Sequence, residues 1–169
     1  MPTPPRTIDA SNRGDHFHLR EGDECYYFHD YTPRQGACYS SGNQLIYNLK
    51  KSVLRRKEAD YRYKIQAIAQ STDMLRAALE RSKWVFDDAT FSPIPPSKPR
   101  DHAEYDDRMT QIVAGVCRGV NADVRDLLIQ GQGYEACHLQ ADGARMRPAQ
   151  LEGMYTLDAE PPKGMVILV

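Results

Sequence analysis

A hydroxyl group and two cations lie close together in the proline-rich segment at residues 95–100. They belong to Ser97, Lys98 and Arg100, and the same segment holds three prolines. Proline fixes the backbone φ angle, so the segment would present these groups with little conformational freedom left to lose. We expect such a corner to bind an anion, because charge-assisted hydrogen bonds are strong contacts for phosphate-like groups. The structural alternative is a stiff linker with incidental charges.

Three arginines farther along the chain are candidates for the same ligand. Arg108 lies in the first turn of a predicted helix, where a cation opposes the helix dipole, and we therefore interpret it as facing a ligand. Arg145 and Arg147 lie within and just after a polar, glycine-punctuated excursion at residues 130–146. A loop of this length between two core strands is either a plain surface loop or a lid over an active site.

The residue types that commonly bind metals are scattered along the chain. They are Cys25, Cys38, Cys117, Cys137, His16, His18, His29, His102 and His138. None of them shows the short paired spacing of structural zinc sites, so we predict no metal site among them and interpret the cysteines as reduced. His16 and His18 would share one face of a strand, and we interpret them as an exposed pair rather than as ligands.

Length and charge narrow the class of protein. The 169 residues suffice for one domain with a sizeable core. The 22 basic and 23 acidic side chains give a net charge of -1, which provides no overall attraction to nucleic acid or to an anionic membrane. The longest aliphatic run has five residues, far fewer than the roughly 20 that span a bilayer. We expect a soluble, cytoplasmic protein without nucleic-acid or membrane partners.

The N-terminal part should contain a tail and a hairpin. Residues 1–14 are rich in Pro, Ser, Asn, Arg and Gly, which predicts a flexible tail. A single α/β domain is then expected over residues 15–169. Two β-prone runs, at residues 16–19 and 25–31, flank a glycine-centred turn and predict a hairpin.

Helices should complete the region up to residue 82. Ser40 or Ser41 is positioned to cap the first of them, which leads into a basic run at residues 50–57. That run is either a patch for phosphate or nucleic acid or a solvated helix end, and we favour the solvated helix end. The segment 59–82 keeps helical spacing, with Ile65 on its predicted apolar face.

The region at residues 83–169 alternates between strands and helices. The predicted order is a strand at 90–94, a helix at 105–120, a strand at 124–129, a short helix from Pro148 to Tyr155 and a strand at 165–169. Alternation of this kind predicts a parallel sheet with right-handed crossovers. Ligands of such sheets bind at the carboxyl ends of the strands, which places the proline-rich corner at a candidate site.

Three features of this region form a pattern. They are the sequence PIPPSK at residues 93–98, the amphipathic helix after it, and the Gly- and Arg-containing excursion before an aliphatic strand. Over residues 83–169 this pattern resembles the type I phosphoribosyltransferases, in particular standalone bacterial proteins related to a competence factor. The resemblance implies a pyrophosphate loop at 95–100 and a mobile loop at about 131–147. It also implies phosphoribosyl pyrophosphate as ligand, Mg²⁺ as cofactor, and glycosyl transfer to or from a nitrogenous base.

The sequence departs from that family at its most diagnostic motif. In the family an aliphatic strand ends in two acidic residues and a Thr/Gly-rich turn, whereas residues 165–169 resemble the strand without the acids or the turn. We therefore expect residues 1–169 alone to be inactive, and favour truncation at Val169 over a turn supplied by another chain. The alternative is a non-catalytic ligand-sensing or interaction subunit, for example of a bacterial defence assembly, with a second copy or another protein as its partner.

Overall fold

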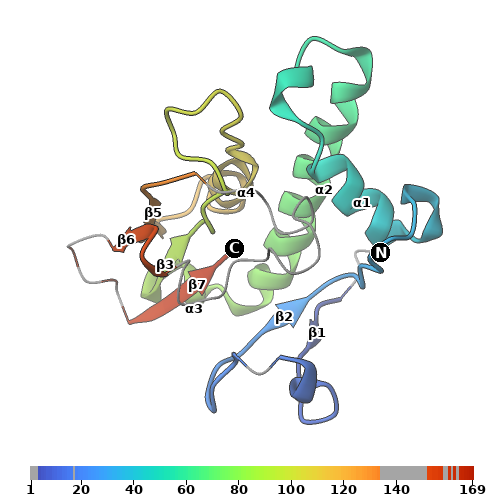
Figure 1. Cartoon of the computed structure of the whole chain (residues 1–169). Helices are drawn as coiled ribbons and strands as arrows, with labels where there is room; N and C mark the ends of the chain where they lie inside the picture. The colour runs from blue at the N-terminus through green and yellow to red at the C-terminus, as the bar shows by residue number, and fades with distance from the viewer. Residues whose placement is uncertain (1–3, 17, 134–151, 158–159, 161, 163) are drawn as a thin grey trace. The chain divides into compact units, whose positions relative to one another are not determined.

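The computed structural model of the chain describes residues 4–16, 18–133, 152–157, 160, 162 and 164–169. The chain divides into two compact units, Met1–Asn48 and Leu49–Val169 (Figure 1). The single α/β domain expected over residues 15–169 stays a prediction. Among the residues described, none of the helices combines the length and the apolar character needed to cross a membrane.

The first unit is built from short elements. They are β1 (Arg6–Thr7), η1 (Arg13–Asp15), β2 (Tyr26–Tyr27), η2 (Ala37–Tyr39) and α1 (Ser41–Leu49), where η denotes a 3-10 helix and α1 ends at the first residue of the second unit. β1 and β2 pair antiparallel, with Arg6 opposite Tyr27. The guanidinium of Arg6 lies 4.4 Å from the centre of the Tyr27 ring and 2.9 Å from Asp30 Oδ2. The expected tail therefore contributes a paired strand.

The hairpin partner expected for β2 was wrong. Residues 16, 18 and 19 lie outside any strand, and β2 pairs instead with β1. The guanidinium of Arg13 donates hydrogen bonds of 2.9 Å to Arg20 O and 3.1 Å to Asp23 O. These bonds hold the turn around Gly22 against η1, so the backbone before the turn is not laid out as a strand.

A buried asparagine fixes the start of α1. Asn43 is 1% exposed, and its backbone N–H donates to Ser40 Oγ at 3.0 Å, which confirms Ser40 as a capping residue. Its side-chain oxygen accepts from the backbone N–H of Thr32 at 2.9 Å, and its Nδ2 donates to the carbonyls of Thr32 and Gln35. One side chain thus joins the helix start to the loop before it.

The second unit contains both helices and strands, and α4 lies between β3 and β4 in the chain. The helices are η3 (Val53–Arg55), η4 (Ala59–Tyr61), α2 (Arg62–Leu79), η5 (Glu80–Ser82), α3 (Trp84–Asp88) and α4 (Arg108–Val116). The predicted helix at 59–82 is confirmed as the run from η4 to η5. Its predicted face was wrong, because Ile65 is 60% exposed while Lys64 and Ala67 are buried.

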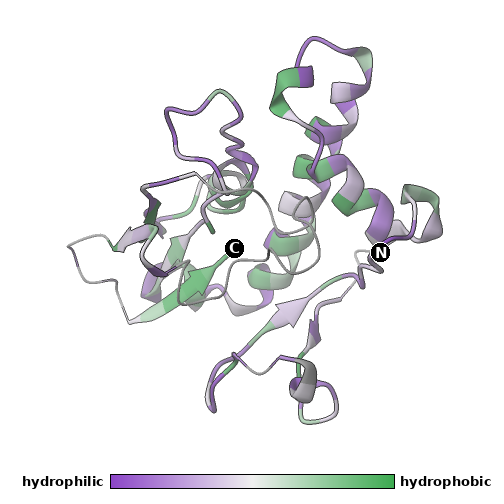
Figure 2. Cartoon of the chain, in the orientation of Figure 1, coloured by the Kyte–Doolittle hydropathy of each residue, from purple (hydrophilic) through white to green (hydrophobic). Residues whose placement is uncertain are grey.

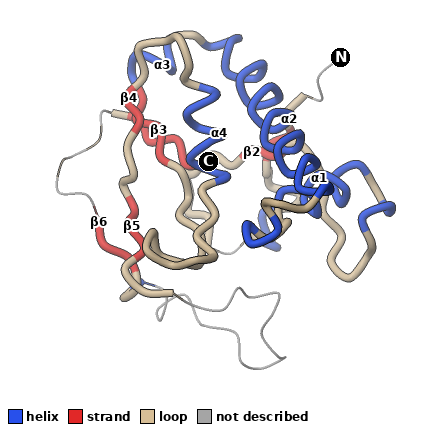
Figure 3. Tube along the Cα trace, turned by 90° about the horizontal axis from the view of Figure 1, so that it is seen from above, coloured by secondary structure: helices blue, strands red, loops and turns tan. Residues whose placement is uncertain are grey.

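Helix α4 lies between α2 and the sheet in Figure 3. A Cβ atom on Gly115 of α4 would lie only 2.7 Å from Thr72 Cγ2 of α2, so glycine permits this close approach. The buried face of α4 consists of Ile112, Val113 and Val116, whose spacings of one and three residues place them on one side of a helix. The helix expected at 105–120 is therefore confirmed with a later start and an earlier end.

The expected parallel sheet is present. β3 (Ala89–Ser92) lies between β4 (Asp123–Val124) and β7 (Met165–Leu168), and both neighbours pair parallel to it. All four residues of β3 are buried, as expected for a central strand covered on both faces. Figure 2 shows β7 as a hydrophobic strand and the loop before α4 as mostly hydrophilic. The structure confirms a mixed α/β fold with a parallel sheet.

The region of the strand expected at 124–129 contains parts of two different sheets, and one of them is a small antiparallel sheet. The predicted strand at 124–129 is split between β4 and β5 (Leu128–Gln130), and β5 pairs with β6 (Tyr155–Leu157). The split has a physical cause. The backbone N–H of Leu127 donates to Ser92 Oγ at 3.1 Å instead of to a strand backbone, so the chain after β4 does not continue its pairing with β3. Tyr155, expected at the end of a helix, lies in β6, and the rest of that predicted helix up to residue 151 lies outside the described residues.

Candidate functional site

The carboxyl ends of β3 and β7 lie side by side. Val169 N donates to Ser92 O at 3.0 Å, and Ile94 N donates to Val169 O at 2.7 Å. The proline-rich segment at 93–100 leaves the sheet at this point. The structure therefore places the predicted corner at the carboxyl end of the central parallel strand, as the sequence indicated.

A small pocket lies at this end of the sheet. Its lining residues are Pro93, Pro95, Pro96, Arg100, Tyr105, Thr110, Asp126, Leu128, Ile129 and Gln130. Its volume is about 30 Å³, which is room for a water molecule or two. Only the leading edge of a larger ligand would enter it.

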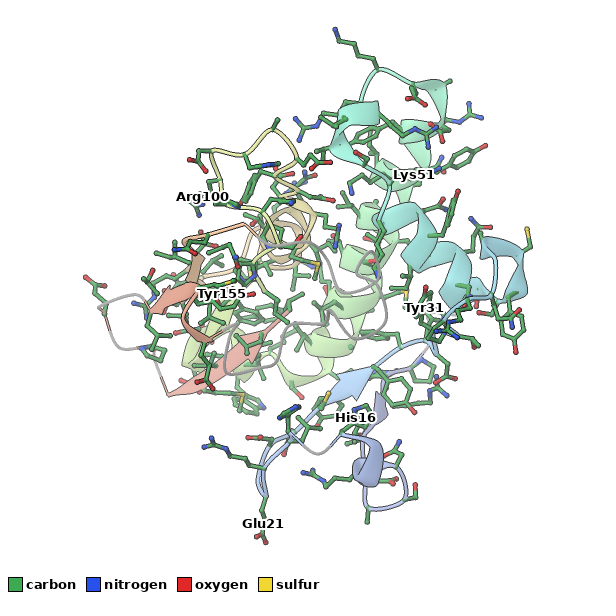
Figure 4. The ribbon with its side chains drawn as sticks, in the orientation of Figure 1. His16, Glu21, Tyr31, Lys51, Arg100 and Tyr155 are labelled. Atoms are coloured by element: carbon green, nitrogen blue, oxygen red, sulfur yellow. The ribbon has the colours of Figure 1, made fainter. Side chains whose placement is uncertain are left out.

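The three predicted anion ligands of the corner differ in exposure. Ser97 and Lys98 are half-buried, whereas Arg100 is exposed and forms an ion pair with Asp126. Figure 4 labels Arg100 on the loop that precedes α4. Asp126 is a residue that sequence reasoning missed, and an incoming anion would have to compete with its carboxylate for Arg100.

The corner packs against the start of the predicted mobile loop. A Cβ on Gly133 would lie 3.3 Å from Pro99 Cδ and 3.7 Å from Lys98 Cδ. Gly133 is the last described residue before the gap at 134–151. Arg145 and Arg147, predicted to close over the ligand, lie outside the described residues.

Arg108 belongs to a different cluster. Its Nη1 lies 2.6 Å from Asp106 Oδ2, and the ammonium of Lys64 lies 2.7 Å from the same oxygen. Lys64 is 1% exposed and also donates to the carbonyls of Leu49 and Lys51, at 2.5 and 2.9 Å. Burial lowers the pKa of Lys64, and its hydrogen bond to Asp106 opposes part of that shift. This cluster joins Lys64 of α2 to Asp106 and to Arg108, the first residue of α4, and was not predicted.

The basic run at 50–57 is partly neutralised by its own neighbours. Asp60 Oδ2 lies 2.8 Å from Lys51 Nζ and 3.1 Å from Arg55 Nη2, and Glu58 lies 2.6 Å from Arg55. The hydrogen bond from Lys51 lowers the pKa of Asp60. These ion pairs favour the interpretation of the run as a solvated structural segment rather than as a ligand patch (Lys51 is labelled in Figure 4).

Gln130 is the second pocket residue that sequence reasoning missed. It is 8% exposed, its Nε2 donates to Gln132 O, and its Oε1 has no hydrogen-bond partner among the described residues. Buried polar atoms in folded proteins nearly always have a partner. The only signal in the sequence is a polar residue at the end of a short apolar run.

The described residues hold no cluster of three or more metal-ligating side chains. This arrangement still fits Mg²⁺, which usually keeps several waters and is held through substrate phosphates and one or two carboxylates. Asp126 is the carboxylate in the pocket that could contribute.

Comparison with known proteins does not assign the chain to a family. No family model, no curated protein and no solved structure matches it. The candidate site therefore rests on its own geometry.

Proposed function

We propose that the chain forms a phosphoribosyltransferase-like site which binds pyrophosphate, or the pyrophosphate group of phosphoribosyl pyrophosphate, at the carboxyl end of the parallel sheet. Ser97, Lys98 and Arg100 are the proposed contacts. Lys98 would act as a point charge on phosphate oxygens, and Arg100 would offer two parallel N–H donors after leaving Asp126.

One observation carries this proposal. The central strand β3 runs directly into the proline-rich corner, and the ends of β3 and β7 are hydrogen-bonded through Val169. Ligands of parallel α/β sheets collect at this edge. The contact between Gly133 and Pro99 also supports the proposal, because it starts the predicted mobile loop beside the corner.

Arg108 is left out of the proposed contacts because Asp106 already compensates its charge at 2.6 Å. Mg²⁺, when bound, would neutralise pyrophosphate oxygens, and Asp126 of the pocket lining is the carboxylate that would hold it. Arg145 and Arg147 remain proposed as cations that stabilise charge as pyrophosphate leaves.

Glycosyl transfer to or from a nitrogenous base is proposed for a protein that carries the acidic, Thr/Gly-rich turn after β7. Residues 1–169 include the aliphatic strand but neither the acids nor the turn. Binding of pyrophosphate at the corner does not require that turn, so binding is the property to test first.

Calorimetry with Mg²⁺ and pyrophosphate tests the proposal. We expect Lys98→Ala to weaken binding by about 1.5–3 kcal/mol, the range of a lost charge-assisted hydrogen bond. The matched control is Lys83→Ala, which removes an exposed lysine before the short helix α3. Equal affinities of Lys98→Ala, Lys83→Ala and the unmodified protein would refute the proposal.

A second candidate is a non-catalytic interaction subunit. Four tyrosines of the first unit are between 48 and 59% exposed, and they are Tyr26, Tyr31, Tyr39 and Tyr47. Exposed tyrosines are enriched at protein interfaces. Absence of phosphoribosyl turnover in the full natural protein, together with loss of a partner on changing Tyr31 and Tyr39 to Ser, would favour this candidate.

A further inference from the structure

We propose that a basic face at the start of α2 docks an acidic segment of a partner protein, with two arginines as the carboxylate contacts and an isoleucine as the apolar contact. We call this surface the α2 face, and it consists of Arg56, Lys57, Tyr61, Arg62 and Ile65. None of these five described residues lines the pocket at the proline-rich corner. The inference therefore does not depend on the proposed function.

Helical spacing brings the residues of the α2 face together. Tyr61 directly precedes α2 and already has helical backbone angles, with φ -61° and ψ -23°. Ile65 follows Tyr61 by four positions and Arg62 by three, which places the three side chains on one side of the helix. Arg56 joins this group through a side-chain hydrogen bond with Tyr61. Figure 1 shows η4 and the start of α2 at the end of the helix that lies away from the parallel sheet.

The cations of the α2 face are not neutralised by ion pairs. Residues 50–64 contain seven Lys and Arg residues but only two acids, so the segment is strongly basic in a chain of net charge -1. Both acids form ion pairs with other cations of the basic run. In the described part of the chain, no carboxylate forms an ion pair with Arg56, Lys57 or Arg62. A negatively charged partner would supply the missing carboxylates.

Two tyrosines hold the arginines in place without neutralising them. Arg62 Nη2 donates to Tyr63 Oη at 3.1 Å, and its guanidinium lies 5.0 Å from the centre of that ring. The hydrogen bond with Tyr61 is the largest cause of the raised pKa of Arg56, with smaller effects from the aspartates before α4. A guanidinium that is already held loses less conformational freedom when it binds a carboxylate through two parallel hydrogen bonds.

Ile65 gives the α2 face an apolar contact. Its side chain is 60% exposed, although helical spacing predicted it to be buried. One exposed isoleucine is ordinary on a protein surface. Its place beside Arg62 and Tyr61, however, matches protein interfaces, which are enriched in Tyr and Arg around an apolar centre.

Two other negatively charged partners fit the α2 face less well. Single-stranded nucleic acid is bound by aromatic rings on which bases stack, whereas the ring of Tyr63 is already contacted by the guanidinium of Arg62. An anionic membrane is bound by helices with several large apolar residues on one face. Ile65 is the only exposed aliphatic residue of α2 that is larger than alanine. An acidic protein segment can satisfy both the arginines and the isoleucine.

The test is fluorescence anisotropy of the full chain with a labelled peptide of Glu-Glu-Leu repeats. We expect saturable binding that weakens as salt is raised, because exposed charges are screened. The double variant Arg56→Gln, Arg62→Gln should weaken binding about tenfold or more, through loss of two charge-assisted contacts. Ile65→Ser should weaken it about threefold or more, through loss of buried apolar area.

Arg81→Gln is the matched control, because Arg81 is an exposed arginine of η5 at the other end of α2. It should bind the peptide as the unmodified protein does. All the substituted residues are exposed, so chemical denaturation should show equal stability for every variant. Pyrophosphate affinity should also be the same in every variant, and its loss in the double variant would overturn the separation of the α2 face from the corner.

Three further probes distinguish the kind of partner. They are a peptide of glutamate alone with the same number of glutamates, a single-stranded oligonucleotide, and vesicles that contain phosphatidylserine. The glutamate peptide should bind more weakly than the Glu-Glu-Leu peptide, because it lacks an apolar contact for Ile65. The inference fails if no peptide binds, if the two peptides bind alike, or if the double variant keeps full affinity. Tighter binding of the oligonucleotide or the vesicles through the same two arginines would replace the protein partner with nucleic acid or lipid.

Discussion

The ammonium group of Lys64 donates a 2.7 Å hydrogen bond to Asp106 Oδ2, although the two residues lie 42 positions apart in the chain. The bond ties the first turn of α2 to Asp106, whose Oδ1 accepts a 3.2 Å hydrogen bond from the backbone N–H of Arg108 at the start of α4. It is buried at the lysine, where the side chain is 1% exposed. The loop that carries Arg100 ends beside the Lys64–Asp106 hydrogen bond, just before α4.

Removal of the Lys64 ammonium should destabilise the second unit strongly. We expect Lys64→Met to lower the free energy of unfolding by about 3 kcal/mol, at the low end for loss of one partner of a buried ion pair. The value is at the low end because Arg108 still compensates Asp106, while the carbonyls of Leu49 and Lys51 lose their donor. Chemical denaturation measures the change.

Lys57→Met is the matched control for that experiment, because Lys57 is exposed. Its effect should stay within about 0.5 kcal/mol, as is usual for surface substitutions. If the two variants unfold alike, the Lys64 tie does not stabilise the protein.

The stability of the first unit should depend on the side-chain N–H groups of Asn43. Asn43→Asp keeps the shape but turns the donor toward the carbonyls of Thr32 and Gln35 into an acceptor. We expect destabilisation of the first unit by about 2 kcal/mol, the penalty for buried polar groups left without partners. Hydrogen exchange of the α1 amides reports the change.

Gln44→Glu provides the same amide-to-acid change at the next residue, which is exposed. Exchange of the α1 amides should be nearly unaffected in this control. Equal acceleration of exchange in both variants would mean that the Asn43 contacts contribute nothing specific.

The buried thiol of Cys117 should react slowly. Burial raises the pKa of Cys117 to about 11, with a smaller opposing effect of Arg76. The thiolate is the reactive form, so alkylation at pH 8 should be at least about tenfold slower at Cys117 than at the exposed Cys38. Peptide-resolved mass spectrometry separates the two sites.

The same shift links folding to pH. A raised pKa in the folded protein means that Cys117 contributes stability below its ordinary pKa of 9.0, and that this contribution is lost as pH rises toward about 11. Cys117→Ser should therefore flatten part of the fall in stability between these pH values. An identical pH profile in the variant would contradict the assigned cause.

Some of the fold could be predicted because its signals are local. The 3.6-residue period of α4 and the aliphatic run of β7 predicted their types correctly. The pairing of β1 with β2 could not be predicted, since two-residue strands carry no alternation pattern. The face of α2 was assigned around Ile65 because apolarity was the only guide, and the acceptors that bury Lys64 come from distant parts of the chain.

Part of the candidate site could also be predicted from the sequence, and part could not. The position of residues 95–100 after a core strand follows from the order of the elements, and the structure places the segment there. Asp126 and Gln130 join the pocket only because the chain leaves β4 and pairs again as β5. That break depends on the hydrogen bond between Leu127 N and Ser92 Oγ, and no local sequence pattern predicts this bond.

The central claim is that an anion binds at the carboxyl end of the parallel sheet. Amide chemical shifts of the isotope-labelled protein, followed during titration with Mg²⁺ and pyrophosphate, test it most directly. We predict saturable shifts that cluster at residues 94–101 and 126–133. Shifts confined to the basic run at 50–57, or no shifts at all, would contradict the claim.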